Sequence, residues 1–210
     1  MQILDEIKEA LMSGDANQVR ERATKALEAG LDPVTIINEG FIMAMNVIGT
    51  KFRNNEIYVP EVLIAARAMH AGLDIVKPLL TGDAQQGKGT VLIGTVKGDL
   101  HDIGKNLVIM MLQGGGFEVV DLGIDVSAEK FVEAVEQNKP DVVAISALLT
   151  STMTNMKTVI DELAAYRDKV KIIVGGAPVT QNFADQIGAD AYAPDGASAV
   201  EKVRELIGIV

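Results

Sequence analysis

The stretch of sequence that decides the fold is residues 90–104, TVLIGTVKGDLHDIG. Its first half, Thr90 to Val96, is an apolar run rich in β-branched residues, which predicts a strand that is buried on both faces. The second half is a polar turn that carries Asp99 and His101, and a helical pattern follows from about Asp102 to Gln113. A buried strand that enters a helix through a short turn is typical of the first unit of a parallel α/β sheet.

The alternation of strand and helix continues through the rest of the chain. The further predicted strands lie at 117–121, 141–145, 170–174 and 189–193, and the further helices at 128–137, 153–166, 181–186 and 197–207. Five strands alternating with five helices predict a flavodoxin-like five-stranded parallel sheet that is covered on both faces. Right-handed crossovers leave few topologies, of which the strand order 2-1-3-4-5 is favoured.

The first 80 residues show helical periodicity only, and four helices are predicted there. Ile3, Ile7 and Leu11 form the apolar stripe of the first helix, and Asp15 caps the second. The apolar faces of the third and fourth helices are predicted to hold Ile37, Phe41, Ala44 and Ile48, and Leu63, Ala66, Met69 and Leu73, respectively. The predicted organisation is a small four-helix bundle over 1–81, a glycine-rich linker over 82–89 and the α/β domain over 90–210.

Composition excludes several classes of function. The net charge of −10 argues against a nucleic-acid partner, because phosphate binding needs clustered Lys and Arg. No run of about 18 apolar residues predicts a membrane span, and the acidic residues near Met1 favour a cytoplasmic protein over a secreted one. The absence of cysteine excludes disulfides, thiolate zinc sites and cysteine-ligated iron–sulfur clusters, and two histidines cannot make a three-histidine site.

The topology predicts where a ligand binds. In a doubly wound sheet, ligands lie beyond the carboxyl ends of the strands where the strand order reverses, here between the first and third strands. The loops that end there are 97–104, 146–152 and 175–178. The first of these is unusually rich in titratable groups, so the site is expected around Asp99 and His101.

The common ligands of this fold do not suit that loop. Gly94, Gly98 and Gly104 do not have the G-x-G-x-x-G spacing of a dinucleotide site, there is no P-loop, and Ser146 stands where a receiver domain needs an aspartate. A loop with a histidine between two aspartates is also a poor FMN phosphate site. It suits a single metal that brings its remaining ligands, with His101 as axial ligand and Asp99 on the other ring nitrogen. The alternative is that Asp102 caps the next helix and His101 is an ordinary surface residue.

Three motifs in order carry a family resemblance. Asp99-x-His101-x-x-Gly104 is followed, after 41 residues (105–145), by Ser146-x-Leu148 and, after 26 more (149–174), by Gly175-Gly176. This pattern resembles the signature of cobalamin-binding domains that hold the cofactor base-off with histidine on. With the N-terminal bundle included, the whole chain resembles the corrinoid proteins of methanogen and acetogen methyl-transfer systems, and is similar to the cobalamin-binding portion of methionine synthase.

The resemblance implies a role for each matching residue. His101 would be the lower axial ligand of cobalt, Asp99 its hydrogen-bond partner, and Thr152 would stand where a serine hydroxyl completes the relay in methionine synthase. Gly104 would leave room for the nucleotide tail. The expected tail pocket and cofactor contacts are otherwise Asp102, Ile103, Ser146, Leu148, Thr150, Gly175 and Gly176.

The function implied is that of a methyl shuttle, non-catalytic alone. It would accept a methyl group on cobalt from a substrate-specific methyltransferase and donate it to a second methyltransferase, with a thiol or tetrahydrofolate as acceptor, and a reductive activator would maintain the cofactor. Methanol, methylamines, methoxylated aromatics and betaines stay open as donors.

Two other functions are compatible with such a domain: a cobalamin-dependent sensor or regulator, and a detached subunit of an adenosylcobalamin mutase. A sensor usually has a tryptophan in the bundle and a DNA-binding module, whereas this chain has no Trp and begins at the bundle. A mutase subunit would not need the bundle.

The predicted role of the bundle is to cover the upper face of the corrin, with Tyr58 and Met69 as candidate contacts. A methionine at helical spacing is more often a core residue. The second histidine, His70, matches no motif and is expected to be an exposed helix residue.

Overall fold

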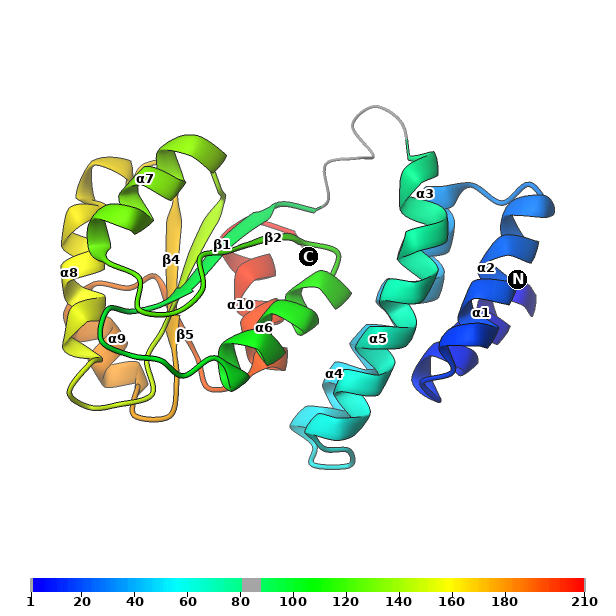
Figure 1. Cartoon of the computed structure of the whole chain (residues 1–210), viewed down its shortest axis with the longest axis horizontal. Helices are drawn as coiled ribbons and strands as arrows, with labels where there is room; N and C mark the ends of the chain where they lie inside the picture. Colours follow the sequence, from blue (N-terminus) through cyan, green and yellow to red (C-terminus); the bar gives the residue numbers. More distant parts are fainter. Residues whose placement is uncertain (1, 81–87, 210) are drawn as a thin grey trace. The chain divides into compact units, whose positions relative to one another are not determined.

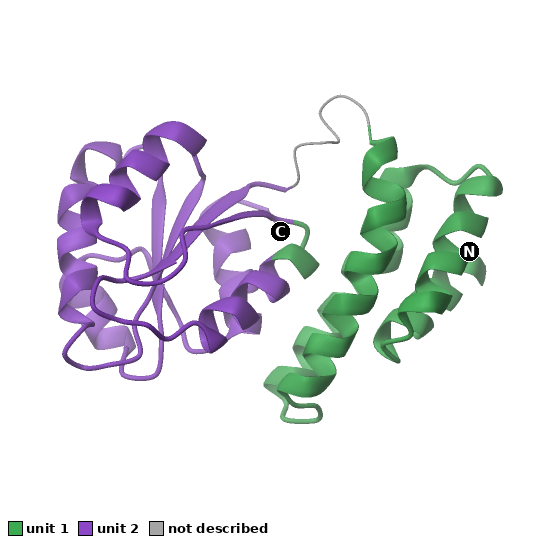
Figure 2. Cartoon of the chain, in the orientation of Figure 1, with its two compact units in different colours: residues 1–87, 113–116 green, residues 88–112, 117–210 purple. Residues whose placement is uncertain are grey.

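The computed structural model describes residues 2–80 and 88–209. The chain divides into two compact units, residues 1–87 with 113–116 and residues 88–112 with 117–210, shown in green and purple in Figure 2. Most of the predicted linker, 82–87, lies outside the described residues.

The N-terminal unit is helical (Figure 1). Its elements are α1 (Gln2–Met12), α2 (Ala16–Glu28), α3 (Pro33–Thr35), η1 (Ile36–Ile42), α4 (Met43–Arg53), α5 (Val59–Val76) and η2 (Lys77–Leu79). As predicted, Asp15 caps α2, because its carboxylate accepts from the backbone N–H groups of Asn17 and Gln18. α5 packs against α1, α2 and α4, so the unit is a small bundle.

The predicted third helix contains a π-helical segment. α3, η1 and α4 follow each other without a break, and η1 is wound with the wider π repeat. This repeat rotates the buried face by one position: Phe41, Ala44 and Ile48 are buried as expected, but Ile36 is buried in place of Ile37, which is half-buried. The constant 3.6-residue period assumed from sequence is therefore wrong at this point.

The buried face of α5 also differs from the predicted one. Ala66 and Met69 are fully buried and Leu73 is half-buried, but Leu63 is exposed, because the face of α5 that packs in the bundle runs through Val62 and Ala65 instead. Met69 is thus a core residue of the bundle and is unavailable as a surface contact, whereas Tyr58, just before α5, is exposed.

The C-terminal unit is the predicted α/β domain. It contains a five-stranded parallel sheet of order β2-β1-β3-β4-β5, which confirms the flavodoxin-like fold. The strands are β1 (Thr90–Thr95), β2 (Glu118–Asp121), β3 (Val142–Ser146), β4 (Lys171–Gly175) and β5 (Ala191–Ala193). The helices are α6 (Ile103–Gly114), α7 (Ala128–Asn138), α8 (Thr154–Glu162) with η4 (Ala164–Tyr166), α9 (Gln181–Ile187) and α10 (Gly196–Leu206).

Helices cover both faces of the sheet. Figure 1 shows α7, α8 and α9 on one face and α6 and α10 on the other. On the first face the core is built from alternate strand residues, such as Val143 and Ile145 of β3 and Ile172 and Val174 of β4, packed around Phe131 of α7. This two-residue alternation fills both layers, since the intervening strand residues are buried as well.

No helix within residues 2–80 and 88–209 combines the length and the apolar character that a membrane span requires.

Candidate functional site

The strand register brings the predicted site residues to one edge of the sheet. Thr95 of β1 pairs with Ser146 of β3, and Ser146 pairs with Gly175 of β4, so the three strands end side by side. The loops that follow these strands carry Asp99, Thr152 and Gly176. This edge includes the point between β1 and β3 where the strand order reverses, as a doubly wound sheet requires for its ligand site.

The loop between β1 and α6 holds His101 in a fixed position. Gly98 has a φ of +82°, a left-handed conformation that glycine adopts without strain, and it turns the chain directly before Asp99. The buried hydroxyl of Thr95 donates to the carbonyl oxygen of His101 at 3.0 Å. The backbone N–H of His101 donates to Asp99 Oδ1 at 3.1 Å. The backbone of His101 is therefore held by hydrogen bonds that are independent of the contacts of its ring.

The ring of His101 is oriented by a buried carboxylate. His101 Nδ1 lies 2.7 Å from Asp99 Oδ1, and Asp99 is fully buried while half of the histidine side chain is exposed. If the proton is on Nδ1, as a carboxylate partner requires at neutral ring charge, Nε2 carries the free lone pair. With Nδ1 bonded to the carboxylate, Nε2 is the ring nitrogen whose chemistry suits a metal ligand.

The second oxygen of Asp99 is held from the β3–α8 loop. Asp99 Oδ2 accepts from the hydroxyl of Thr152 at 2.6 Å and from the backbone N–H groups of Leu148 at 2.8 Å and Leu149 at 3.3 Å. Thr152 is buried, so this contact is shielded from water. The structure thus joins His101, Asp99 and Thr152 in one hydrogen-bonded chain across two loops.

The pKa of Asp99 is set by two opposing effects. Burial raises it, but the hydrogen bonds from the Thr152 hydroxyl, the Leu148 N–H and His101 outweigh burial and bring the pKa well below its ordinary value of 3.8. The carboxylate is therefore negatively charged throughout the physiological range and remains an acceptor for the imidazole.

The three glycines among the predicted tail-pocket residues differ in how much space surrounds them. A Cβ on Gly104, near the start of α6, would meet no atom within 4 Å, so the space beside it is open. A Cβ on Gly176, whose φ is +125°, would lie 1.8 Å from the carbonyl oxygen of Ala147, and one on Gly175 would lie 2.8 Å from that of Ala193. The paired glycines are thus required by close backbone packing, whereas nothing in the described residues fills the space beside Gly104.

The remaining predicted contact residues are mostly exposed. Leu148, Thr150, Asp102 and Ile103 are exposed, and Ser146 is half-buried at the end of β3. The carbonyl oxygen of Asp102 accepts from the backbone N–H of Asn106, and its carboxylate accepts from the side chain of Asn106. Both contacts join Asp102 to the first turn of α6, but neither is a hydrogen bond from a backbone N–H to the Asp102 carboxylate, as a side-chain cap would make.

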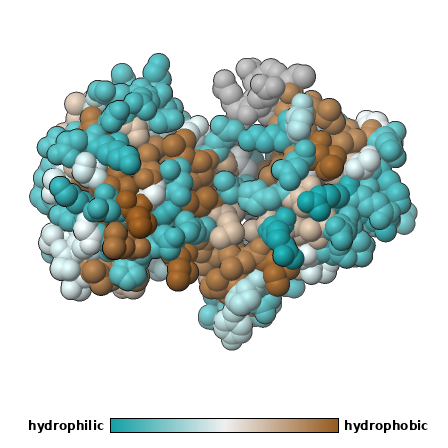
Figure 3. All heavy atoms as spheres, viewed as in Figure 1, coloured by the Kyte–Doolittle hydropathy of each residue, from teal (hydrophilic) through white to brown (hydrophobic). Residues whose placement is uncertain are grey.

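Apolar side chains are exposed around the histidine. Figure 3 shows apolar patches at the surface of the chain, and in the α/β unit the large exposed apolar residues are Leu100, Ile103, Ile124, Leu148 and Leu149. Three of the five lie in the two loops that hold His101 and Thr152, and Ile103 is the first residue of α6, directly after the first loop. Such a group of apolar side chains fits the flat, largely apolar face of a macrocycle better than a hydrated metal ion.

Several contacts of the site have no signal in the sequence. Sequence reasoning missed the N–H groups of Leu148 and Leu149, because the main chain carries no residue-specific pattern. It also missed Asp125, whose Oδ1 accepts from Gly98 N at 2.7 Å, and the ion pair of buried Lys105 with Asp121 at 2.6 Å. A lysine in the first turn of an apolar helix was a usable signal for the ion pair, because a buried lysine needs a partner.

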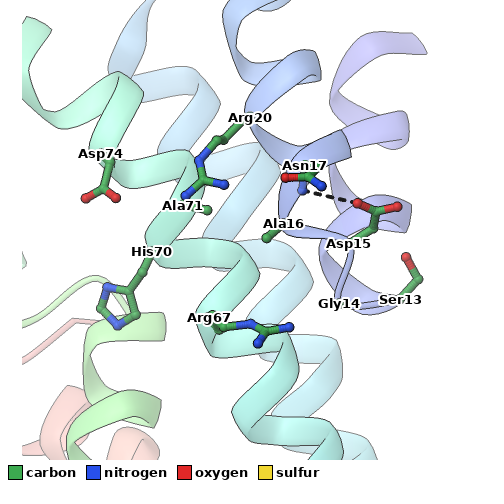
Figure 4. Close-up of a pocket in the computed structure, with 10 residues that line it drawn as sticks. All are labelled: Ser13, Gly14, Asp15, Ala16, Asn17, Arg20, Arg67, His70, Ala71 and Asp74. Carbon is green, nitrogen blue, oxygen red and sulfur yellow. Dashed lines mark hydrogen bonds between the residues drawn. The ribbon is translucent and has the colours of Figure 1, made fainter.

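The helical unit has a hollow of its own (Figure 4), with a volume of about 680 Å³. Its charged lining residues, Arg20, Arg67, Asp15 and Asp74, offset one another, and the Asp15 carboxylate is occupied as the cap of α2. His70 forms part of the wall and is half-buried, so its predicted exposure is wrong. This hollow lies in a different unit from His101 and shares none of its chemistry.

Comparison with known proteins places the chain in a family. B12-binding domain families match residues 89–204 and residues 3–77. The first match covers more than half of the chain, and the protein therefore belongs to the B12-binding family of corrinoid proteins.

The most similar relatives extend over nearly the whole chain. It is 46% identical over 212 residues to the trimethylamine corrinoid protein of Methanosarcina barkeri, covering 99% of this chain and 98% of the relative. It is 43% identical over 209 residues to the dimethylamine corrinoid protein of the same organism, covering 98% of each. The similarity to corrinoid proteins predicted from the sequence motifs is confirmed.

Solved structures agree with this assignment. A chain of the methanol:cobalamin methyltransferase complex of Methanosarcina barkeri superimposes with a TM-score of 0.89 at 34% identity, covering 100% of this chain and 81% of that one. A cobalamin-binding protein of Desulfitobacterium hafniense has a TM-score of 0.81 at 31% identity, covering 97% and 98%. The cofactor of the protein is thus cobalamin or a related corrinoid.

The residues present fit such a cofactor. His101 offers one half-exposed imidazole beside exposed Leu100 and Ile103, and the space beside Gly104 is open. A corrin supplies the equatorial nitrogens of its cobalt, so a single protein ligand is sufficient.

Proposed function

We propose that this protein is a methyl shuttle whose corrinoid is held by His101 and whose partners are methyltransferases. The single observation that carries the proposal is the chain of hydrogen bonds from His101 through Asp99 to Thr152, at the edge of the sheet where ligands bind. A buried carboxylate on Nδ1 and a half-exposed imidazole ring are what an axial imidazole ligand needs.

The bound corrinoid supplies a cobalt atom that can accept and release a methyl group. The residues of the chain tune that atom. Asp99 fixes the proton of His101 on Nδ1 and makes Nε2 the coordinating atom. The hydroxyl of Thr152 donates a hydrogen bond to Asp99 Oδ2. The other carboxylate oxygen, Oδ1, then faces the imidazole. In this arrangement the donor strength of the imidazole depends on a residue of another loop.

The tail of the corrinoid is proposed to lie in the space beside Gly104. Ser146, Leu148, Gly175 and Gly176 are its proposed walls, with Asp102, Ile103 and Thr150 as further contacts. The support is that these residues lie in or next to the three loops at one edge of the sheet, and that nothing described fills the space beside Gly104.

The helical unit, residues 1–81, is proposed to act as a cap that shields the upper face of the corrin from water and opens for each methyltransferase through the linker 82–89. The support is a set of large exposed apolar side chains on α4, on α5 and at the residue that precedes α5, among them Met43, Val47, Leu63 and Tyr58. A surface of this kind on a bundle of this size is typical of a binding face. Tyr58 remains a candidate contact and Met69 does not.

The partners are proposed to be a substrate-specific methyltransferase, a second methyltransferase that takes the methyl group to a thiol or tetrahydrofolate, and a reductive activator. Two relatives are named for trimethylamine and dimethylamine, and a similar chain belongs to a methanol:cobalamin methyltransferase complex. A methylated amine is therefore the first donor class to test. The net charge of −10 favours a partner with a basic rim.

The experiment loads purified protein with corrinoid, reduces it, and adds trimethylamine, dimethylamine or methanol, with and without each candidate methyltransferase. Methyl transfer to the cofactor is followed by its visible absorbance. We expect a change only when one methyltransferase is present, which also identifies the donor. Catalytic-rate transfer from a donor without any added protein would contradict the shuttle function.

A further inference from the structure

The loop between β2 and α7 is hydrogen-bonded to the backbone of Gly98 and of Asp99 through a single residue, Asp125. The carboxylate of Asp125 accepts from the backbone N–H of Gly98 at 2.7 Å, and its own backbone N–H donates to the carbonyl oxygen of Asp99 at 3.1 Å. Asp125 thus restrains the Lys97–Gly98 peptide group, which precedes Asp99 by one residue, and the Asp99–Leu100 peptide group, which directly follows the Cα of Asp99.

Asp125 has a left-handed backbone, with a φ of +52°. This conformation is uncommon for residues other than glycine, and aspartate is one of the few that tolerates it. A positive φ alone marks only a turn. Here the residue in that conformation directs its carboxylate toward the N–H of Gly98 and its backbone N–H toward the carbonyl oxygen of Asp99, on either side of the same turn.

Asp125 is itself held in place, because the β2–α7 loop continues the hydrogen-bond ladder of β1. Leu122 N donates to Ile93 O at 2.8 Å, Thr95 N donates to Gly123 O at 3.0 Å, and Val126 N donates to Thr95 O at 2.9 Å.

An ion pair between buried Lys105 and partly exposed Asp121 holds the start of the same loop. Asp121 Oδ1 accepts from the buried ammonium of Lys105 at 2.6 Å and from Gly123 N at 2.9 Å. Since Lys105 is in the first turn of α6, this pair ties the loop to the C-terminal end of the segment that carries His101, and the hydrogen bonds to β1 tie it to the N-terminal end.

Restraint of the Asp99 backbone matters because its carboxylate has two fixed partners. Oδ1 must reach His101 Nδ1 at 2.7 Å and Oδ2 must reach Thr152 Oγ1 at 2.6 Å, in different loops. A rotation of the backbone at Asp99 would lengthen at least one of these contacts. A side chain can satisfy both only when its main chain is held.

We propose that Asp125 is a positioning residue for the imidazole of His101, acting through the backbone of Asp99. Its action on the imidazole is a property of the chain alone, and its consequence for cobalt rests on the proposed function. The role of the side chain is that of a hydrogen-bond acceptor, and its charge is not required.

The first test uses the corrinoid-free full chain labelled with ¹⁵N at histidine, at about pH 8, where imidazoles are ordinarily neutral. The chain has two histidines, so two imidazoles are observed, and His70 serves as internal control. Asp125→Gly keeps the left-handed backbone without strain and removes the acceptor. We expect the ratio of Nδ1–H to Nε2–H tautomers of His101 to fall by about 10-fold, and hydrogen exchange at Gly98 N to accelerate.

Asp125→Asn keeps an acceptor oxygen and tolerates the same φ, so both signals should return to wild-type values. Lys139→Gly is the matched control, because Lys139 also has a positive φ, +48°, but ends α7 at the opposite edge of the sheet. A wild-type tautomer ratio and Gly98 exchange in Asp125→Gly would show that Asp125 is only a turn residue. An Asp125→Asn protein that behaves like Asp125→Gly would also overturn the proposal.

The second test measures the fraction of cobalt(II) that carries the imidazole, from the nitrogen splitting of its EPR signal in the loaded protein. We expect this fraction to fall in Asp125→Gly and to be restored in Asp125→Asn. A wild-type fraction in Asp125→Gly would overturn the link to cobalt. If instead the splitting persists in His101→Ala, the proposed cobalt ligand fails, and the tautomer result for Asp125 stands independently.

Discussion

Asp99 and His101 form a pair in which the fully buried member holds the half-exposed one, through a 2.7 Å contact between Asp99 Oδ1 and His101 Nδ1. The buried carboxylate accepts four further hydrogen bonds, three of them from the β3–α8 loop. A carboxylate with this many donors keeps its charge in spite of burial. Its strength as an acceptor is therefore available to the imidazole, and the chemical consequences of that coupling are testable.

The first prediction concerns the metal ligand. Replacing His101 by alanine should remove the nitrogen splitting from the cobalt(II) EPR signal of the loaded protein and change its visible spectrum, because the axial imidazole is lost. His70→Ala is the control, since His70 is the only other histidine and lies in the other unit. Splitting that persists in His101→Ala, or that disappears in His70→Ala, would show that the ligand assignment is wrong.

The second prediction concerns the carboxylate. Asp99→Asn should weaken the imidazole as a cobalt ligand, by about 10- to 100-fold if it resembles other residues that orient metal ligands. Cobalt(I) prefers no axial ligand, so the weaker ligand destabilises cobalt(II) more than cobalt(I). The cobalt(II)/(I) midpoint potential should become less negative, by about 60–120 mV for this one-electron couple. Spectroelectrochemical titration measures it, and an unchanged potential would leave Asp99 with a structural role only.

The third prediction concerns acid stability of the corrinoid-free protein. The pKa of Asp99 is lowered in the folded state, so its charged form binds protons less readily there than in the unfolded chain. The charged carboxylate of Asp99 thus makes its full contribution to the free energy of unfolding above about pH 5. That contribution is lost as pH falls through the pKa of the unfolded chain toward the lower pKa of the folded state. Urea denaturation from pH 6 to pH 3 should show a smaller loss of stability in Asp99→Asn than in wild type.

Thr152→Val is the companion variant for that titration. It keeps the shape of the side chain and removes the hydroxyl that donates to Asp99 Oδ2 at 2.6 Å. The folded pKa of Asp99 should rise, so the pH dependence should fall between those of wild type and Asp99→Asn, while Thr152→Ser should retain the wild-type dependence. Identical slopes in all four proteins would contradict the assigned coupling.

The sheet could be predicted from the sequence because each strand is a short apolar, β-branched run, and the structure confirms all five within about two residues. The fifth strand begins later than predicted, at Ala191, because Ala189 N still bonds to Ala184 O at the end of α9. The π segment from Ile36 to Ile42 was not predictable, since a single changed turn leaves no periodic signal of its own.

The site could be predicted only in part. The types and spacing of Asp99 and His101 indicated a metal ligand, but their contact with Thr152 joins positions 53 residues apart and was expected only from a family resemblance. Two sets of contacts could not be found from the sequence, because they depend on loop conformation. These are the hydrogen bonds of Asp125 to the backbone around Asp99, and those of the Leu148 and Leu149 N–H groups to the Asp99 carboxylate. Local patterns predict which residues are chemically suited to a site, whereas tertiary packing decides which of them meet.

The fourth prediction separates two glycines that the motif treats alike. A Cβ at position 104 would meet no protein atom within 4 Å, and Gly104 has no left-handed backbone. The free energy of unfolding of Gly104→Ala should therefore lie within about 1 kcal/mol of the wild-type value. Ala at position 176 would lie 1.8 Å from the Ala147 carbonyl oxygen at a φ of +125°, so Gly176→Ala should lose about 3 kcal/mol or more.

Corrinoid binding should distinguish these two variants in the opposite sense. If the nucleotide tail occupies the space beside Gly104, the added methyl group overpacks that space, and the affinity of Gly104→Ala for cobalamin should fall by about 10-fold or more while the corrinoid-free protein stays stable. Equilibrium dialysis with hydroxocobalamin measures the affinity, and urea denaturation of the corrinoid-free proteins gives the stability. A Gly104→Ala protein that binds cobalamin as tightly as wild type would mean that the tail lies elsewhere, because no fold defect is available to mask the effect at this position.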